Sequence, residues 1–331
     1  MKTKATLKKI SSRLNLSIST VSRALKDHPD ISTETKQRVM ELASLLEYEP
    51  NTYAINLRTN SSKLLGVIVP VISTYFYHSF IASLEEEARK MGYSLVIFQS
   101  ADDPAIEQEN LKLCKQNRVA GLFVCITTYT KDISSFLKLN EMDIPVIFFD
   151  KVPPYEACNK VCLADADAAA IAAEKIIQRK KKKVLAIFGN AELSITKKRM
   201  KSFLEVFSNK APQTKLNIAY ANSFEEAMMQ TYTVCSGNDK PDTVFCMSDE
   251  ILTGAMKAVH RLKLKIPADI ALISVSNGFI PRLFDPEITY VETSGAELGK
   301  LAFKRMMDHF GGKTFIQELH IPSKLVEGNS I

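Results

Sequence analysis

The sequence predicts an α/β protein in which a three-helix head with a helix-turn-helix precedes two lobes built on parallel sheets. Three observations predict this architecture. Two short amphipathic helical patterns separated by a turn stand at the start of the chain. Beyond residue 64, short β-rich apolar runs alternate with helical patterns. Positive charge is concentrated before residue 64. The length agrees with this division, because 331 residues, at roughly 150 residues per domain, suggest about two globular domains.

The net charge of +6 is unevenly distributed along the chain. Up to Lys63 there are eleven Lys and Arg against six Asp and Glu, whereas the rest of the chain holds 32 against 31. The first 26 residues contain seven basic residues and no acidic one. A basic head on a nearly neutral body is typical of a nucleic-acid-binding module, although charge alone suits a solvated basic tail equally well.

The first helix of the head is expected to begin after Thr6, which is a good N-cap. Leu7, Ile10 and Leu14 then recur at helical spacing. Asn15 tolerates the left-handed backbone conformation that a tight turn needs. The sequence therefore predicts a short helix that ends in a turn.

Ser17 offers a second N-cap, so a second helix is expected from about Ile18 to about Leu25, and Ser32 is expected to cap a third helix that closes a small core. Two short helices joined by a turn of three or four residues form a helix-turn-helix. The outward face of the second helix carries small hydroxyl residues and an arginine. Such a face can enter a major groove, where arginine pairs bidentately with guanine. The same face would also suit an ordinary solvent-exposed helix. That face comprises Ile18, Ser19, Ser22 and Arg23, with Thr20 near its start.

A short segment after the head reads as one more helix and a linker. Pro50 ends the helical pattern that precedes it, and Asn51 can cap a further turn or two of helix. The composition of residues 59–62 is typical of a flexible linker. An isolated helix of about eight residues is marginal in water, so it should form only when something packs on it. We therefore expect a DNA-binding domain at residues 1–50 and a hinge helix with a linker at residues 51–63.

Seven short apolar runs beyond residue 64 are continuous rather than alternating, as in strands buried on both faces of a parallel sheet. Helical patterns separate them, which indicates right-handed crossovers. Pro153-Pro154 interrupts the alternation, so we expect two lobes that divide near residues 150–162. The runs are 65–71, 95–98, 122–126, 146–149, 184–188, 244–247 and 271–275.

Ligands of open parallel sheets bind beyond the carboxyl ends of the strands. This rule nominates polar and aromatic residues that follow the predicted strands, although each of them singly could merely cap the next helix. Together they predict a small-molecule pocket between the two lobes. The nominated positions are 73–77, 127–129, 150, 190–194, 248–249 and 276–277.

Other chemistry has no motif in this sequence. There is no G-x-G-x-x-G, G-x-x-x-x-G-K-[ST], G-x-S-x-G or H-E-x-x-H pattern, so we expect no catalytic residue, no cofactor and no enzymatic activity. Six cysteines form no C-x-x-C pair and five histidines are scattered, so we expect reduced thiols and no metal site.

Neither a signal-like start nor an apolar run of roughly 18 residues occurs, so we expect a cytoplasmic protein. The basic run Arg179 to Lys183 is more consistent with a solvated helix end, where cations suit the helix dipole, than with a nucleic-acid patch.

A gapless pattern in about the first 65 residues runs through Leu16–Leu25, His28–Ser32, Tyr48–Asn51, Ala54 and Leu57–Thr59. It resembles the head and hinge of the lactose/galactose repressor family. In that family the second helix lies in the major groove, and a hinge helix from each subunit pushes a leucine into the minor groove. The resemblance implies DNA contacts by Thr6, Ser17, Ile18, Ser19, Thr20, Ser22, Arg23, Asn51, Ala54, Leu57 and Arg58.

The head departs from the family pattern at three positions. Asn15 and Glu47 stand where glycine is usual, and Glu49 stands where a basic residue is common. Asn15 is compatible with the turn for the reason given above, whereas Glu49 would weaken one contact with the DNA backbone.

The body resembles the effector domain of the same family up to about Val326, and that domain is similar to periplasmic sugar-binding proteins. The resemblance implies an effector-binding and dimerisation domain over residues 64–331, with late crossings between the lobes near residue 290. It also implies that an aromatic residue lies against the effector ring and that an arginine grips hydroxyls or a carboxylate. The implied effector-binding residues are Tyr75, Phe76, Asp150, Arg199, Ser248, Asp249, Ser276 and Asn277.

Ser276 replaces an acid that would bind sugar hydroxyls in the family, and Ser202 replaces a glycine. The effector is therefore expected to be a sugar or sugar derivative, and a phosphorylated or carboxylated ligand for Arg199 stays open.

These observations predict a ligand-responsive, sequence-specific transcriptional regulator that binds a palindromic DNA operator as a homodimer, because one head reads only a half-site. Effector binding would change lobe closure and so favour or disfavour the hinge helices. One alternative is a DNA-binding sugar kinase, but the sequence lacks its phosphate-binding glycine loop. Another is an exported solute-binding protein, against which the basic head and the absent signal argue.

Overall fold

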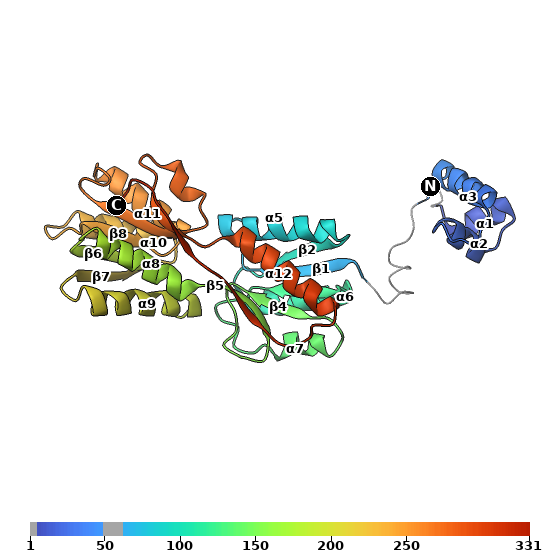
Figure 1. Ribbon diagram of the computed structural model, residues 1–331, viewed down its shortest axis with the longest axis horizontal. Coiled ribbons are helices and arrows are strands. Elements are labelled where there is room, and N and C mark those ends of the chain that lie inside the picture. The colour runs from blue at the N-terminus through green and yellow to red at the C-terminus, as the bar shows by residue number, and fades with distance from the viewer. Residues whose placement is uncertain (1–4, 49–61) are drawn as a thin grey trace. The chain divides into compact units, whose positions relative to one another are not determined.

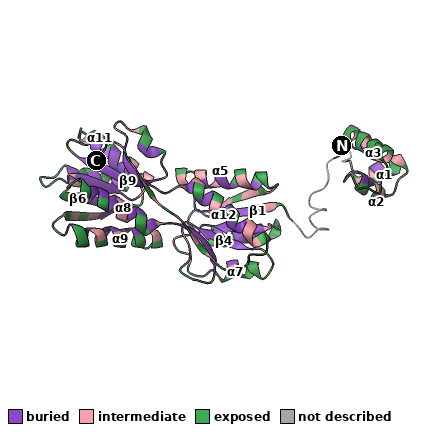
Figure 2. Ribbon diagram, viewed as in Figure 1, coloured by how far each residue is buried: buried purple, intermediate pink, exposed green. Residues whose placement is uncertain are grey.

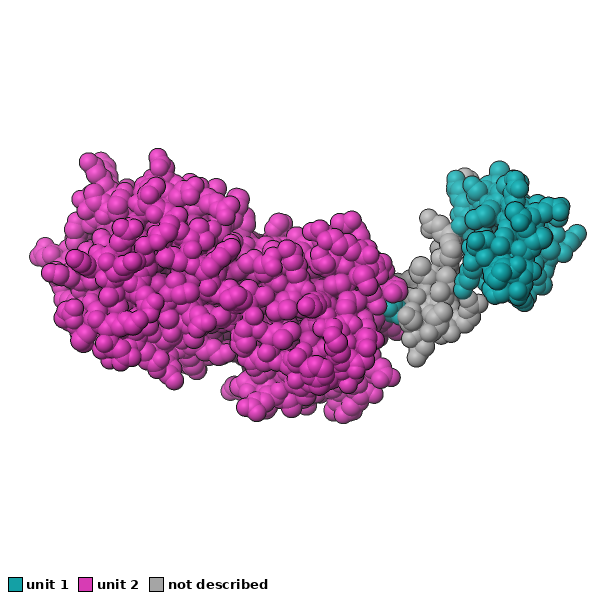
Figure 3. Space-filling view, viewed as in Figure 1, with its two compact units in different colours: residues 1–62 teal, residues 63–331 magenta. Residues whose placement is uncertain are grey.

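The computed structural model describes residues 5–48 and 62–331 (Figure 1). The chain divides into two compact units, residues 1–62 and residues 63–331, which Figure 3 colours separately. Unit 1 buries one apolar cluster that includes Ile10, Val21 and Val39. Unit 2 buries three apolar clusters of its own around two sheets. Each unit therefore has a separate hydrophobic core.

The described residues of unit 1 form α1 (Leu7–Leu14), α2 (Ile18–Ala24) and α3 (Thr33–Leu45), which confirms the predicted three-helix head. Asn15 ends α1 with a left-handed φ of 54°, as the turn requires. Glu47, the other residue at a position where glycine is usual, also has a left-handed φ, of 48°. Each helix begins at a hydroxyl cap that accepts a backbone N–H bond, and these caps are Thr6, Ser17 and Ser32.

The first lobe of unit 2 is a six-stranded sheet in the order β11-β5-β4-β3-β1-β2, and all of its pairs are parallel. Helices α5 and α12 pack on one face and α6 and α7 on the other. The strands are β1 (Leu64–Val69), β2 (Ser94–Gln99), β3 (Gly121–Val124), β4 (Val146–Phe149), β5 (Asn159–Leu163) and β11 (Glu318–Ile321). The helices are α5 (Tyr75–Lys90), α6 (Pro104–Gln116), α7 (Ser134–Asn140) and α12 (Gly295–Phe310).

The second lobe is a six-stranded sheet in the order β12-β10-β9-β8-β6-β7, parallel except for the pair of β10 with β12. Helix α8 packs against α9, and α10 packs against α11. The strands are β6 (Lys183–Phe188), β7 (Lys215–Tyr220), β8 (Thr243–Cys246), β9 (Ala271–Ser276), β10 (Thr289–Glu292) and β12 (Lys324–Val326). The helices are α8 (Asp165–Gln178), α9 (Ser194–Lys210), α10 (Phe224–Cys235), α11 (Asp249–Arg261) and the 3-10 turn η1 (Ile280–Leu283).

All seven predicted runs contain strands, but the sequence pattern misses β5, β7, β10, β11 and β12. Strands β7 and β11 are only partly buried along their length, so they lack a continuous apolar run. Strand β5 is fully buried but starts with Asn159 and Lys160, which break the pattern. Arg305 donates to the Asn159 side chain, and Lys160 pairs with Glu318, so both polar residues are compensated inside the lobe.

Within residues 62–331 the chain passes between the lobes after β5, after β10 and between β11 and β12. The prediction that the lobes divide near residues 150–162 stops short of the first crossing, because β5 still belongs to the first sheet and the chain leaves it after Leu163. These three passages join the lobes: the first and the third run from the first lobe to the second, and the one that follows Glu292 runs back to the first lobe.

The inner strands of both sheets, such as β3, β4, β8 and β9, are buried along their whole length (Figure 2). All six cysteines are buried and unpaired. Burial raises the pKa of Cys114 to about 12, so this thiol stays protonated at neutral pH. None of the helices in residues 5–48 and 62–331 is both long and apolar enough to cross a membrane.

Candidate functional site

The outward face of α2 is open to solvent, as the sequence predicts. Ile18 is 49% exposed, and Val21 and Ala24 on the opposite face are fully buried. Ser19 and Arg23 are exposed, and Thr20 and Ser22 are half-buried. The Ser17 hydroxyl caps α2 and lies 2.7 Å from the Ser19 hydroxyl and 2.8 Å from the Thr20 hydroxyl. These hydroxyls form one polar cluster at the start of α2.

Arg23 projects from the same face, and its side chain is 51% exposed. Its Nη1 lies 4.0 Å from Oδ2 of Asp30, which is a loose pair in solvent and contributes little to stability. The guanidinium therefore keeps its donors available for a DNA base. The predicted contacts at Asn51, Ala54, Leu57 and Arg58 lie outside the described residues.

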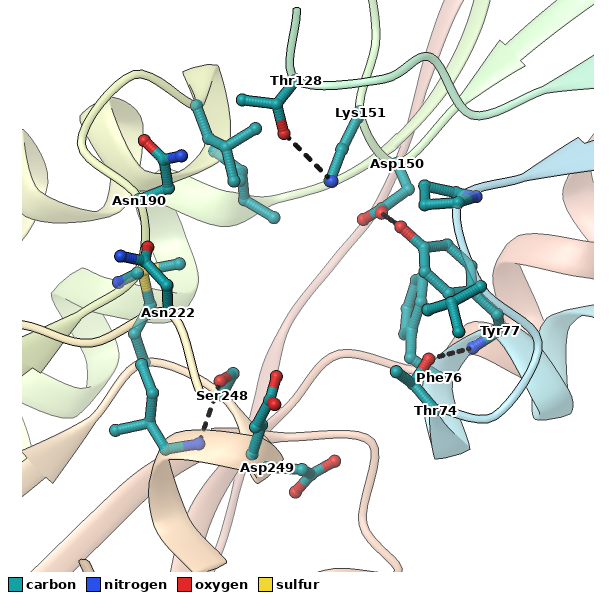
Figure 4. A pocket seen from close by; sticks show the side chains of 18 of the residues that line it. Thr74, Phe76, Tyr77, Thr128, Asp150, Lys151, Asn190, Asn222, Ser248 and Asp249 are labelled. Carbon is teal, nitrogen blue, oxygen red and sulfur yellow. Dashed lines mark hydrogen bonds between the residues drawn. The ribbon is translucent and has the colours of Figure 1, made fainter. Parts of the chain in front are cut away.

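A cavity of about 1010 Å³ opens in unit 2 where the carboxyl ends of strands from both sheets meet. Figure 4 shows side chains from the two lobes facing each other across it, with Tyr77 and Asp150 on one side and Asn190, Asn222 and Ser248 on the other. All eight residues that the family resemblance assigns to the effector line this cavity: Tyr75, Phe76, Asp150, Arg199, Ser248, Asp249, Ser276 and Asn277.

In the first lobe, Asp150 presents a carboxylate to the cavity. Its Oδ2 accepts a hydrogen bond of 2.7 Å from the Tyr77 hydroxyl, and no bond within the described residues engages Oδ1. Burial and the neighbouring Asp150 charge raise the pKa of Tyr77 well above its ordinary value, so the phenol stays a donor. Asp150 has a left-handed φ of 57°. Its Oδ1 is therefore available for a ligand hydroxyl.

Lys151 and Asp102 also line the cavity, although neither was among the predicted strand-end residues. Lys151 Nζ donates to Asp102 Oδ1 at 3.2 Å. It also donates to Thr128 Oγ1 at 3.5 Å (Figure 4). Asp102 follows β2 and Lys151 follows Asp150, so the strand-end rule could have included both. Asn222, which was also missed, follows β7, a strand with no signal in the sequence.

In the second lobe, Asp249 begins α11 directly after its N-cap, Ser248. The Ser276 hydroxyl donates to Asp249 Oδ1, and the Asn277 backbone N–H donates to Oδ2 at 3.1 Å. Burial raises the pKa of Asp249, while the Ser276 and Asn277 bonds and the Arg199 charge oppose that shift. The acid that is usual in the family at position 276 is thus absent. Ser276, at the end of β9, instead donates a hydrogen bond that positions the Asp249 carboxylate there.

Asn277 lines the cavity, and its side-chain amide forms hydrogen bonds with residues of the first lobe. Its Nδ2 donates to the Tyr75 carbonyl oxygen at 3.2 Å and to Ser79 Oγ at 3.0 Å, and its Oδ1 accepts from Gly295 N at 2.8 Å. The Tyr75 and Phe279 rings stack with centroids 4.4 Å apart. A ligand that contacts these residues would therefore directly affect the hydrogen bonds and ring stacking between the lobes.

Arg199 is 5% exposed and already engaged. Its Nε and Nη2 donate to Asp165 Oδ1 at 3.0 and 2.8 Å, and Nη1 donates to the Met247 carbonyl oxygen at 2.8 Å. These bonds use three of the five N–H groups of a guanidinium, so two remain for a ligand. The sequence did not nominate Asp165, because it follows the missed strand β5.

Comparisons with known proteins identify both units. A family model described as "Bacterial regulatory proteins, lacI family" matches residues 6–51, and one described as "Periplasmic binding proteins and sugar binding domain of LacI family" matches residues 62–328. The curated HTH-type transcriptional repressor PurR of Mannheimia succiniciproducens is 25% identical, over 99% of this chain and 98% of its own. PurR of Klebsiella pneumoniae is 26% identical, over 99% and 97%.

Solved structures share the fold over nearly the whole chain. The Lac repressor dimer bound to operator and the anti-inducer ONPF aligns with a TM-score of 0.88 at 18% identity, covering 99% of each chain. The transcriptional regulator CelR in complex with cellobiose aligns with a TM-score of 0.71 at 16% identity, covering 99% of this chain and 100% of its own.

The Asp165→Asn substitution is expected to lower the free energy of unfolding by about 3 to 5 kcal/mol, because it leaves the buried Arg199 guanidinium without its counter-charge. Urea denaturation at neutral pH measures this change. The matched control is Asp167→Asn, an exposed acid in the same helical turn, for which the loss should stay below about 1 kcal/mol. Equal unfolding midpoints for Asp165→Asn and the unsubstituted protein would contradict the role assigned to this ion pair.

Proposed function

This chain belongs to the LacI family of bacterial regulatory proteins, and we propose that a small molecule bound in its cavity modulates its affinity for a palindromic operator. The family assignment makes it a DNA-binding transcriptional regulator with a ligand-binding domain. Its curated relatives are transcriptional repressors rather than enzymes, so a DNA-binding sugar kinase gains no support. We further propose that it acts in the cytoplasm, where its DNA is.

One observation carries the proposal of ligand control. The eight residues assigned to the effector come from segments between positions 75 and 277, and all of them line one cavity between the lobes. Tyr75 and Asn277 also form a hydrogen bond between the lobes, so occupancy of the cavity would be coupled to the angle between the lobes. A ligand shifts such an equilibrium when it binds the two lobe arrangements with different affinities.

The charge of the cavity supports an uncharged ligand. Its lining has four carboxylates, of Asp102, Asp150, Asp249 and Glu250, against two cations, Lys151 and Arg199. Asp165 compensates Arg199 from behind the lining. A phosphorylated or carboxylated ligand would meet this excess of negative charge, whereas the hydroxyls of a neutral sugar can donate to carboxylates.

Exposed aromatic rings at Tyr75 and Tyr129 offer apolar faces for the C–H groups of a sugar ring. The cellobiose complex of CelR shares this fold, which is consistent with a sugar or sugar derivative as the effector.

We propose that α2 reads the major groove through Ile18, Ser19, Thr20 and Arg23, with Thr6, Ser17 and Ser22 near phosphates. Residues 1–50 would form the DNA-binding domain, 51–63 the hinge and linker, and 64–331 the effector-binding and dimerisation domain. In the hinge, Asn51 and Arg58 would contact DNA, Ala54 would allow two hinges to approach closely, and Leu57 would be the minor-groove wedge.

The Arg23→Ala substitution is expected to cost about 1 to 3 kcal/mol of binding to an operator selected from random DNA, and to relax the preference at one base pair. Fluorescence anisotropy with the selected duplex and its single-base variants measures both effects. Lys26→Ala, which removes an exposed cation just beyond α2, should leave base preference unchanged. Uniform weakening of Arg23→Ala on selected and random DNA would reassign Arg23 to a phosphate.

A thermal-shift screen of sugars, sugar phosphates, sugar acids and nucleosides should identify a neutral sugar that stabilises by about 2.7 kcal/mol at 100 times its dissociation constant. Asp150→Asn should then weaken this ligand roughly tenfold or more, because a hydrogen bond to a charged group is worth about 1.5 to 3 kcal/mol. Asp143→Asn is the matched control, since Asp143 is exposed and has the same φ of 57°. A sugar phosphate as the strongest stabiliser would overturn the argument from cavity charge.

We expect a homodimer, because a helix-turn-helix reads one half-site and two-fold proteins read palindromes. The Lac repressor, which shares the fold, binds its operator as a dimer. Sedimentation velocity at micromolar concentration should give a species of two 37.0-kDa chains. A predominant monomer or tetramer would be incompatible with this assembly.

A further inference from the structure

The end of the second lobe that lies opposite the cavity gathers four separate segments of the chain. The carboxyl ends of β6, β7, β8 and β9 line the cavity, so the amino ends of these strands lie at the other edge of the sheet. Their register places these starts side by side, with Lys183 paired to Lys215 and Thr243 to Ala271. We call this edge the distal end, and it comprises residues 179–183, 210–215, 236–242 and 262–270.

The distal end is strongly positive. It contains ten Lys and Arg against three Asp, a formal excess of seven, although the whole chain beyond Lys63 has an excess of only one. The remainder of unit 2 is therefore negative, and the unit is polarised. The basic run Arg179 to Lys183 supplies five of the ten cations, and three other loops supply the rest. The sequence does not reveal this convergence, because the four segments are spread along the chain from residue 179 to residue 270.

Most of these cations lack a carboxylate partner. Lys183 and Lys215 share Asp239, and Lys210 pairs with Glu174. Within the described part of the chain, no ion pair engages the other seven, six of which are exposed and one, Lys181, half-buried. They are Arg179, Lys180, Lys181, Lys182, Lys240, Lys263 and Lys265.

Helix dipoles account for only part of this charge. Helices α8, α9, α10 and α11 all end at the distal end, and cations near helix C-termini are favourable. Each C-terminus carries roughly half a negative charge, so four termini offset about two positive charges. An excess of about five positive charges is left, and favourable interactions with helix C-termini do not account for it.

We propose that the distal end is a second, sequence-independent DNA-binding surface that contacts the phosphate backbone of a duplex in addition to the DNA read by the head. Nine of its ten cations are lysines, which are depleted in protein interfaces but contact phosphates readily. Its four loops contain no aromatic residue, and aromatic anchors characterise protein interfaces. Phosphate contacts carry no base information, so the surface holds DNA without selecting a sequence.

The test uses residues 63–331, which contain both complete sheets and their own hydrophobic cores. Their binding to a mixed-sequence duplex of about 30 base pairs is measured by fluorescence anisotropy between about 50 and 200 mM salt. The combined substitution Lys180→Gln, Lys181→Gln and Lys182→Gln breaks no ion pair. It should weaken binding at least about tenfold at the lowest salt and reduce the slope of log K against log salt by about 2 to 3.

The matched control is Lys112→Gln, Lys131→Gln and Lys138→Gln, which removes the same charge from exposed, unpaired lysines of the first lobe. It should leave affinity and slope nearly unchanged, and equal thermal melting of all proteins verifies folding. The full chain carrying either triple substitution is measured on the same duplex, so the result does not depend on the fragment alone.

The proposal is overturned if residues 63–331 do not bind the duplex, or if both triple variants weaken binding alike. It is also overturned if the distal substitutions abolish binding to vesicles containing phosphatidylglycerol but leave DNA binding intact, because the surface would then recognise a membrane. These results are independent of ligand identity and of the contacts made by the head.

Discussion

Parallel strands bring all of their carboxyl ends to one edge of a sheet, and the arrangement of this protein depends on that directionality. Two sheets turn these edges toward each other, so strand-end side chains and helix N-termini from both lobes line one cavity. The same directionality sends the helix C-termini of the second lobe to the opposite edge, where cations accumulate. The negative cavity and the positive distal end are thus two consequences of one topology.

Some residues that line the cavity also form hydrogen bonds between the lobes, and the proposed ligand response rests on this overlap. Asn277 follows β9 in the second lobe, yet its amide bonds to Tyr75, Ser79 and Gly295 in the first. Asp165, directly after the first crossing, holds Arg199 at the cavity wall. A ligand that competes for any of these hydrogen bonds would change the relative stability of the lobe arrangements. Because each lobe is tightly packed, it would move as a rigid body when that arrangement changes.

Local chemistry made much of this fold predictable. Hydroxyl caps at Thr6, Ser17 and Ser32 and the left-handed turn at Asn15 depend only on neighbouring backbone groups, and all four appear as predicted. Strands buried on both faces were visible as apolar runs. Edge strands such as β7 face solvent on one side, and β5 carries Asn159 and Lys160, whose compensating partners lie more than 140 residues away, so neither strand had a local signal.

The sequence by itself determined the three-helix head, the seven strands that carry continuous apolar runs, and part of the set of strand-end residues that line the cavity, because caps, turns and burial patterns act over a few residues. Only the tertiary structure decided that Asp165 neutralises Arg199, that Asn277 holds the lobes together, and that four basic or polar loops join into the distal end. These features depend on which strands are neighbours and on distances across space. Coulomb forces and hydrogen bonds respond to those distances, whatever the separation along the chain.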